Sequence, residues 1–345
     1  MRWILRKAMR AGASVAGRAT GTQGIIKMAR LREAVKMLVP FAGIFVVYLL
    51  HMFIPNAYPQ GYMPKHWATA LLICSALWAI IYTVSLVVVP VRKRACRLSW
   101  LIAFVFLFFE AWDIATLKTG TLRLPFIPSP DKVIEQLIAN FPNIVKATVA
   151  SITLLAQGLS IGLVLGFLSG VLCGCSSIAS YWVSPLLKIV GPVPGLVWLP
   201  VFAIAFQSSF AGSLAAIVLA VWFPMTLILA NGIKNTDISL IERAETLGAS
   251  RAFIVMHVMI PNAIPALADA LFMALSGSFG ALAAAELCGV GTGLALAVRM
   301  MGTIANFGVV FAYVFAMILI FATLTAIMFA VRNWLLRWQK GLVRW

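Results

Sequence analysis

The chain has 345 residues, of which 62% are hydrophobic and 11% charged, and its mean hydropathy is +1.00. This composition excludes a soluble globular protein and leaves almost no chain for a large catalytic head, because each membrane crossing uses about 20 apolar residues. The 27 basic and 10 acidic residues give a net charge of +17. Because the basic residues lie between apolar runs, they indicate membrane topology and not a nucleic-acid site.

Residues 1–36 form a basic segment rich in Gly and Ala, which we expect on the cytoplasmic side or at the lipid surface. Apolar runs long enough to span a bilayer follow at 37–55, 67–90, 98–117, 148–172, 183–206, 211–232, 262–288 and 306–331. The sequence therefore predicts an all-α, polytopic membrane protein with about eight transmembrane helices.

The distribution of basic residues predicts the orientation of these helices. With the N-terminus inside, about 21 of the 27 basic residues fall in cytoplasmic segments, including the turn at 92–97. We therefore expect both termini to be cytoplasmic.

The connection at 118–147 is predicted to be external. Its proline-rich stretch, 124–130, favours an extended chain, because each proline disfavours a helical conformation in the residue before it. Asp131 is then expected to cap a short surface helix over 132–140.

The internal connection at 233–261 carries helix start and stop signals. Ser239 and Glu242 have the spacing of a capping box, and Gly248 suits the left-handed residue that ends a short helix. Ser250 can cap a second helix, which runs until Pro261 breaks it. A short amphipathic helix of this kind cannot bury its apolar face alone, so the segment predicts a socket on a partner protein.

The residues of this connection resemble a known signature. The run Glu-Arg-Ala-Glu-Thr-Leu-Gly at 242–248, with Val-Met-Ile-Pro at 258–261, is similar to the cytoplasmic loop of permease subunits of binding-protein-dependent ABC importers. That loop reads Glu-Ala-Ala, three residues, Gly, nine residues, Ile-x-Leu-Pro, and Arg243 departs from it. The resemblance implies a coupling helix at about 238–250 that docks on the ATP-binding subunit. The coupling residues that it implies are Glu242, Ala244, Glu245, Leu247, Gly248, Arg251 and Pro261.

Further matches over about 120–345 resemble the permeases of the nitrate, sulfonate, taurine and bicarbonate group. They are the Leu-Pro opening at 124–130, the Pro-rich stretch at 192–200, and Ala-Glu at 285–286 followed by Gly-Leu at 293–294, with Ala295 in place of the last Gly. The resemblance implies a type I permease domain at 98–345. Residues 1–97, with two extra helices, are then an accessory segment.

The resemblance also implies partners and a location. The chain is expected in the bacterial inner membrane as a homodimer, with two copies of an ABC ATP-binding subunit and a periplasmic or lipid-anchored binding protein. Its expected substrate is a small anion such as a sulfonate or taurine. ATP and Mg would be bound by the partner, because the chain lacks a phosphate-binding Gly-x4-Gly-Lys-Ser/Thr loop. We therefore predict no enzymatic activity and no cofactor for this chain; an ion-coupled secondary transporter is the alternative.

Several residues within the apolar runs are candidates for the pathway. Three prolines in nine residues interrupt helical hydrogen bonding, which favours a lining role. Glu286 and Arg299 share one helix end, where the carboxylate can pair with the arginine, shape an outer gate or receive the binding protein. The pathway and gate candidates are Pro192, Pro194, Trp198, Pro200, Glu286 and Arg299.

The remaining polar and small residues favour structural roles. We expect Glu110 and Asp113 at the membrane interface and Asp269 in a hydrogen bond to a neighbouring helix. The glycines at 162, 166 and 170 form a close-packing stripe. The three histidines, His51, His66 and His257, are separated by the predicted topology, and the five cysteines show no paired spacing, so we predict neither a metal site nor a disulfide.

Overall fold

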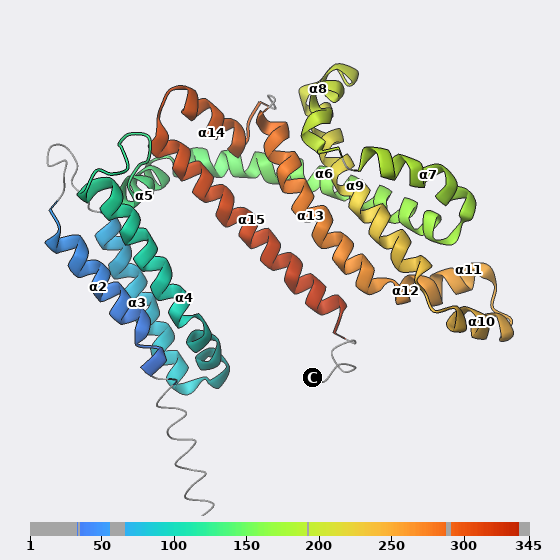
Figure 1. Cartoon of the computed structure of the whole chain (residues 1–345), viewed down its shortest axis with the longest axis horizontal. Coiled ribbons are helices and arrows are strands. Elements are labelled where there is room, and N and C mark those ends of the chain that lie inside the picture. Colours follow the sequence, from blue (N-terminus) through green and yellow to red (C-terminus); the bar gives the residue numbers. More distant parts are fainter. Residues whose placement is uncertain (1–32, 34, 56–65, 192, 288–290, 338–345) are drawn as a thin grey trace, which may run out of the picture. The chain divides into compact units, whose positions relative to one another are not determined.

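The computed structural model describes residues 33, 35–55, 66–191, 193–287 and 291–337, and every regular element in these ranges is a helix (Figure 1). Contacts divide the chain into two compact units, residues 1–135 and 136–345. The predicted domain boundary after residue 97 lies inside a helix, as shown below. Most of the basic N-terminal segment falls outside the described residues.

The described part of the first unit contains the helices α2 (Val39–Phe53), α3 (His66–Val87) and α4 (Val89–Asp113), and α4 continues into the π-helical turn η1 (Ile114–Lys118). The three helices pack on one another through a core that includes Ile44, Val47, Trp67 and Leu71. Apolar side chains that recur on one face of each helix favour this packing.

The basic turn predicted at 92–97 is wrong, because these residues lie within α4. Pro90 occupies the first turn of the helix, where its missing N–H leaves no hydrogen bond unmade. Arg, Lys and Ala are good helix formers, so nothing in the basic run ends the helix. The domain boundary predicted after residue 97 would therefore divide a continuous helix.

Asp131 stabilises a different helix from the one predicted. It lies in the first turn of α5 (Pro130–Ala139), but its Oδ1 accepts hydrogen bonds from the backbone N–H groups of His66 (2.8 Å) and Trp67 (2.7 Å). These are the first amides of α3, which have no partner within their own helix. The acidic cap therefore links α5 to the start of α3.

The second unit is built on α6 (Phe141–Cys175) and α9 (Ser209–Lys234), which have the most extensive contacts of any helix pair among the described residues. Around this pair lie α7 (Ser177–Val190), α8 (Gly195–Ala205), α13 (Ile264–Leu287), α14 (Leu294–Thr303) and α15 (Phe307–Leu335). The predicted all-α fold is confirmed for the described residues.

A row of glycines allows α6 and α9 to approach closely. A Cβ added at Gly158 would lie 2.5 Å from Ile217, and one added at Gly162 or Gly166 would lie 2.6 Å from Val221 or Met225. The same pattern continues at residues 170 and 174. The predicted close-packing stripe is confirmed, and it is longer than the three glycines that predicted it.

Six of the described helical segments are long and apolar enough to cross a membrane: 66–87, 89–118, 141–175, 209–234, 264–287 and 307–335. The predicted count of eight is not confirmed. The run 37–55 forms a helix of only 15 residues. The run 183–206 is divided between α7 and α8, because the chain leaves the helical path between Val190 and Gly195.

Candidate functional site

The segment between α9 and α13 folds into a series of short helices, which we call the α9–α13 connection (residues 235–263). They are α10 (Ile238–Thr246), α11 (Arg251–Ile254), the π-helical η2 (Val255–Met259) and α12 (Ile260–Asn262). In Figure 1 they lie together at the end of α9 and at the start of α13. The connection holds every residue that the sequence implied for coupling.

Asp237 begins α10, in place of the predicted Ser239. The Asp237 carboxylate accepts the backbone N–H of Ser239 at 2.9 Å, and the helix starts at Ile238. The predicted capping box of Ser239 and Glu242 is therefore wrong. Aspartate caps a helix as well as serine does, and it occurs two residues earlier in the chain.

The end of α10 agrees with the prediction for Gly248. Its φ is +79°, in the left-handed region, and a Cβ at this position would have no neighbour within 4 Å. The N–H of Ala249 donates to the carbonyl of Ala244 (3.0 Å), and the N–H of Gly248 donates to the carbonyl of Glu245 (2.9 Å). This pair of bonds is a Schellman motif, in which glycine avoids the steric penalty of a side chain.

The second predicted helix start is also confirmed. The Ser250 hydroxyl accepts the N–H of Phe253 at 3.3 Å, and α11 begins at Arg251. The helix then widens into η2 and ends after α12, so that the break at Ala263 follows Pro261 as expected.

Large apolar side chains on the connection are exposed. The exposed fractions are 88% for Leu247, 68% for Ile238, 64% for Met256 and 50% for Phe253. Of the implied coupling residues, Glu242, Glu245, Leu247, Gly248 and Arg251 are exposed, whereas Ala244 and Pro261 are half-buried. The connection thus combines caps at the starts of α10 and α11 with an exposed apolar surface, which also includes Leu240 at 39% exposed.

The proline-rich stretch produces the break between α7 and α8. Pro194 precedes the first residue of α8, Pro200 lies within α8, and Trp198 stacks on Phe202 with ring centroids 6.1 Å apart. Pro192 lies outside the described residues. Next to the break is a cavity of about 410 Å³, which Pro194 lines together with Phe223 of α9 and residues of α13. The described Trp198 and Pro200 are not among its lining residues.

Gly277 and Gly280 line this cavity from α13, beside Ala281 and Ala284. Both glycines are exposed, and a Cβ at Gly280 would have no neighbour within 4 Å. The absence of side chains at these positions keeps the cavity open.

Glu286 is buried and does not pair with Arg299. It is 1% exposed, and its carboxylate accepts the Ser151 hydroxyl at 2.5 Å and the N–H of Ala295 at 2.7 Å. Ser151 in turn accepts the N–H of Leu294 at 3.0 Å. Arg299 donates instead to the backbone carbonyl of Leu287.

The carboxylate of Glu286 therefore caps α14 from a neighbouring helix. A Cβ at Gly293 would clash with the Glu286 carboxylate, so glycine is needed for the helix start to approach it. A negative charge is favourable at a helix N-terminus, because the first amides lack partners there. Ser151 is one of several hydroxyl residues in an apolar run, and nothing in the sequence indicated that it would be part of this network.

Two of the basic residues in the predicted cytoplasmic segments lie at a second cavity. This cavity of about 530 Å³ is lined by Lys188 and Lys234 and by serines including Ser180 and Ser184. Lys234 Nζ donates to Ser180 Oγ at 2.7 Å. The pair of lysines lies 46 residues apart in the chain, so spacing alone did not indicate it.

Asp269 makes the contact that was predicted for it. Its Oδ1 accepts a hydrogen bond from Arg332 Nη2 of α15 at 2.9 Å. The pair joins α13 to α15.

An all-α unit with several possible membrane spans and a capped, exposed connection between two of them has the architecture of a polytopic membrane protein. Residues 162–341 match the family described as binding-protein-dependent transport system inner membrane component, and the chain belongs to this family. The match covers α9, the α9–α13 connection and α13, and it leaves the first unit outside. The predicted resemblance is thereby confirmed.

Similar proteins of known name agree with this family. The taurine transport system permease protein TauC of Escherichia coli K12 is 29% identical over 68% of this chain and 84% of its own length. The formylaminopyrimidine transport permease protein ThiX of Halalkalibacterium halodurans is 27% identical over 69% of this chain and 94% of its own. The bicarbonate transport system permease protein CmpB of Synechococcus elongatus is 29% identical over 41% of this chain and 50% of its own. These relatives are transport permeases and not enzymes, as predicted.

Proposed function

We propose that the chain is the permease of an ATP-driven importer, and that the α9–α13 connection docks on an ATP-binding subunit. The observation that carries this proposal is the exposure of Ile238, Leu247, Phe253 and Met256 on a segment whose caps fix its backbone. A partner surface would cover these side chains. Each Å² of apolar area removed from water stabilises the complex by about 25 cal/mol, which favours association.

The proposed assembly contains two copies of the chain and two ATP-binding subunits, with both termini in the cytoplasm. ATP binding would draw the two α9–α13 connections together and switch the pathway to face outward. Hydrolysis of ATP would return the pathway to its first state. The chain itself holds no ATP in this proposal.

The docking surface can be tested by adding a charge to it. Leu247→Asp is expected to abolish co-purification with the ATP-binding subunit, because a carboxylate in an apolar interface loses its hydration without a partner. Asn143→Asp is the matched control, since it adds the same charge at an exposed polar position in the first turn of α6, outside the connection. Equal co-purification of both variants with the subunit would refute the docking proposal.

The coupling to ATP has its own test. The purified chain in liposomes is expected to show no ATP hydrolysis and no uptake until the ATP-binding subunit and the binding protein are added. Uptake by the isolated chain, driven by an ion gradient, would favour a secondary transporter.

We also propose that the cavity beside the α7–α8 break belongs to the transport pathway. Gly280→Leu would fill the open space on α13 and is expected to stop uptake while leaving the complex assembled. Ser276→Leu, at an exposed position of the same helix that does not line the cavity, is the control. Unchanged uptake by Gly280→Leu would place the pathway elsewhere.

For the substrate we propose a small anion, with sulfonates such as taurine first. The names of the TauC and CmpB relatives support this class, as does the cavity with Lys188 and Lys234, where positive charge attracts anions. Calorimetry of the cognate binding protein with taurine, other sulfonates, nitrate, bicarbonate and formylaminopyrimidine would identify the ligand. Binding of formylaminopyrimidine alone would refute the anion and leave the importer intact.

A further inference from the structure

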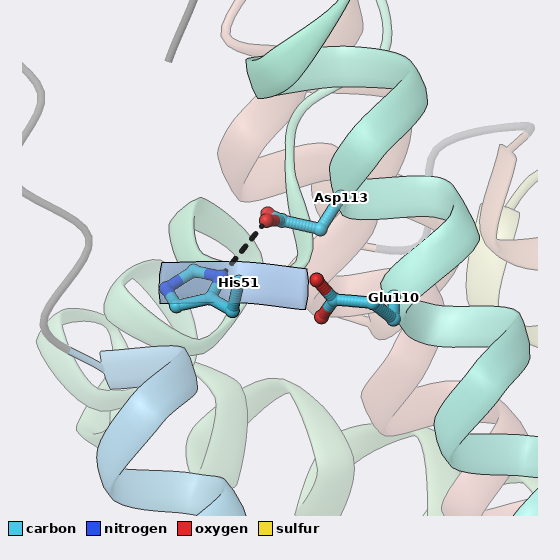
Figure 2. A group of neighbouring side chains, drawn as sticks. All are labelled: His51, Glu110 and Asp113. Carbon is cyan, nitrogen blue, oxygen red and sulfur yellow. Dashed lines mark hydrogen bonds and ion pairs between the residues drawn. The ribbon is translucent and has the colours of Figure 1, made fainter. Parts of the chain in front are cut away.

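The first unit, which lies outside the family match, contains a buried cluster of three titratable side chains. We call His51 of α2 with Glu110 and Asp113 of α4 the His51 cluster; the three residues are 8%, 1% and 0% exposed. Figure 2 shows both carboxylates pointing from α4 toward the imidazole. The packing of α2 and α3 on α4 covers Glu110 and Asp113, for which we predicted a position at the membrane interface.

The three side chains bring potential metal ligands close together. His51 Nδ1 lies 3.2 Å from Asp113 Oδ2, and one ligand atom from each of the three residues lies within 4.8 Å of the others. Glycine or apolar residues would suffice to pack two helices at this point. Two carboxylates and an imidazole are a costly choice unless something compensates their charge.

Two oxygens of the cluster have no hydrogen-bond partner. Glu110 Oε2 accepts the Trp67 indole N–H at 3.0 Å, but Glu110 Oε1 is buried without a donor, and so is Asp113 Oδ1. Buried carboxylate oxygens in folded proteins are almost always satisfied, so two in one cluster indicate a further ligand.

The neighbouring lysine does not satisfy these oxygens. Lys118 Nζ donates to the backbone carbonyls of His51 (2.6 Å) and Ile54 (2.8 Å) at the end of α2. There it stabilises carbonyl groups that have no partner within their helix. Its charge reduces the negative charge of the cluster, but its hydrogen bonds are used elsewhere.

We propose that the His51 cluster binds a divalent transition-metal ion, of the class of Zn²⁺ or Mn²⁺, through His51 Nδ1 and one oxygen each of Glu110 and Asp113. One imidazole nitrogen and two carboxylate oxygens are ligands that these ions accept, and the imidazole disfavours Ca²⁺ and Mg²⁺. The ion, with the water that completes its coordination, supplies partners for both oxygens. A proton on His51 is the competing cation, but it would give neither oxygen a hydrogen-bond donor.

The experiment measures metal binding by the full chain, purified in detergent with an affinity tag that contains no histidine and stripped with a chelator. Equilibrium dialysis followed by elemental analysis is expected to find about one Zn²⁺ or Mn²⁺ per chain, with Ca²⁺ and Mg²⁺ as comparison ions. His51→Ala and Asp113→Asn are expected to weaken binding at least about tenfold. His257→Ala and Asp269→Asn, which change the same residue types outside the cluster, are expected to bind as the wild type does.

Two results would overturn the proposal. One is wild-type protein that holds no more Zn²⁺ or Mn²⁺ than the dialysis buffer does, and the other is cluster variants that bind these ions as well as the control variants do. Asp113→Asn preserves the shape of the side chain, and size-exclusion chromatography monitors its folding. If the variants do not fold, the absorption spectrum of Co²⁺ added to the wild-type chain tests the metal site instead. Absorption bands of Co²⁺ bound by nitrogen and oxygen ligands support the site, and the spectrum of the hydrated ion refutes it. None of these readouts depends on the transport function proposed above.

Discussion

Glycine serves opposite purposes in the α6–α9 interface and in the α9–α13 connection. At Gly162 the backbone is helical, and an added Cβ would meet Val221 at 2.6 Å. At Gly248 an added Cβ would meet nothing, but φ is +79°. In the first case the neighbouring helix requires glycine, and in the second the residue's own backbone does.

The difference teaches where a substitution will act. A side chain in the interface must move two helices that form the centre of the second unit, so its effect is global. A side chain at Gly248 strains one turn that has no buried neighbours, so its effect is local. Substitutions in the two regions should separate loss of folding from loss of partner docking.

The largest effect is expected from Gly162→Leu. The side chain would have to displace Val221 and the carbonyl of Val218, which a Cβ would approach at 3.0 Å, and we expect a loss of more than about 3 kcal/mol in the free energy of unfolding. The loss of stability is measured by thermal unfolding, with size-exclusion chromatography as the readout of the fraction that stays folded. Gly302→Ala is the control, since its Cβ meets nothing within 4 Å in a helix, and it should be neutral or slightly stabilising. A folded Gly162→Leu chain of wild-type stability would contradict the packing described here.

Glu286→Ala is expected to have the next largest effect. It leaves the Ser151 hydroxyl and the N–H of Ala295 without their buried acceptor, at a cost of about 1–3 kcal/mol. Glu286→Gln retains an acceptor oxygen and should cost less. Thermal unfolding of both variants checks the order, and equal destabilisation would show that the charge matters more than the hydrogen bonds.

Gly248→Leu is expected to cost about 1–2 kcal/mol, confined to the connection. Hydrogen exchange should increase at the amides of Gly248 and Ala249, while the overall unfolding temperature stays close to that of the wild type. Under the proposed function, stimulation of the ATP-binding subunit should also fall. Gly248→Asn should preserve both, since asparagine tolerates a left-handed backbone. Global unfolding of the Gly248→Leu variant would show that its effect is not local, and would contradict the difference from Gly162 described above.

The smallest effect is expected from Asp269→Asn. Its side chain is 58% exposed and that of Arg332 is 39% exposed, so water screens the ion pair and its loss should cost no more than about 1 kcal/mol. Unfolding measured at low and high salt should show the difference shrinking as salt increases. A salt-independent loss would show that the residue acts through packing.

Local chain signals predicted the part of the site that local bonds build. Gly248 and Ser250 behaved as expected because a turn and a cap depend on residues a few positions apart. The start of α10 was misassigned for the same reason, since Asp237 and Ser239 both satisfy the cap pattern and only the backbone distinguishes them.

Contacts between distant segments could not be predicted in this way. Glu286 was correctly singled out as a buried acid that needs a partner, but Ser151 lies 135 residues away in an apolar run. The His51 cluster was missed because the predicted topology separated the histidines from one another and the acids were placed at the membrane surface. The packing of α2 and α4, which brings His51 to Asp113, has no signature in either helix alone.

The α6–α9 interface also limits how related sequences can diverge. Each of the glycines at 158, 162, 166, 170 and 174 faces one residue of α9, at 217, 221, 225, 229 and 233. A glycine can therefore change to alanine only if the facing residue becomes smaller in the same lineage. In an alignment of relatives, these five pairs should covary one with one, whereas position 248 should vary independently of every residue in α9.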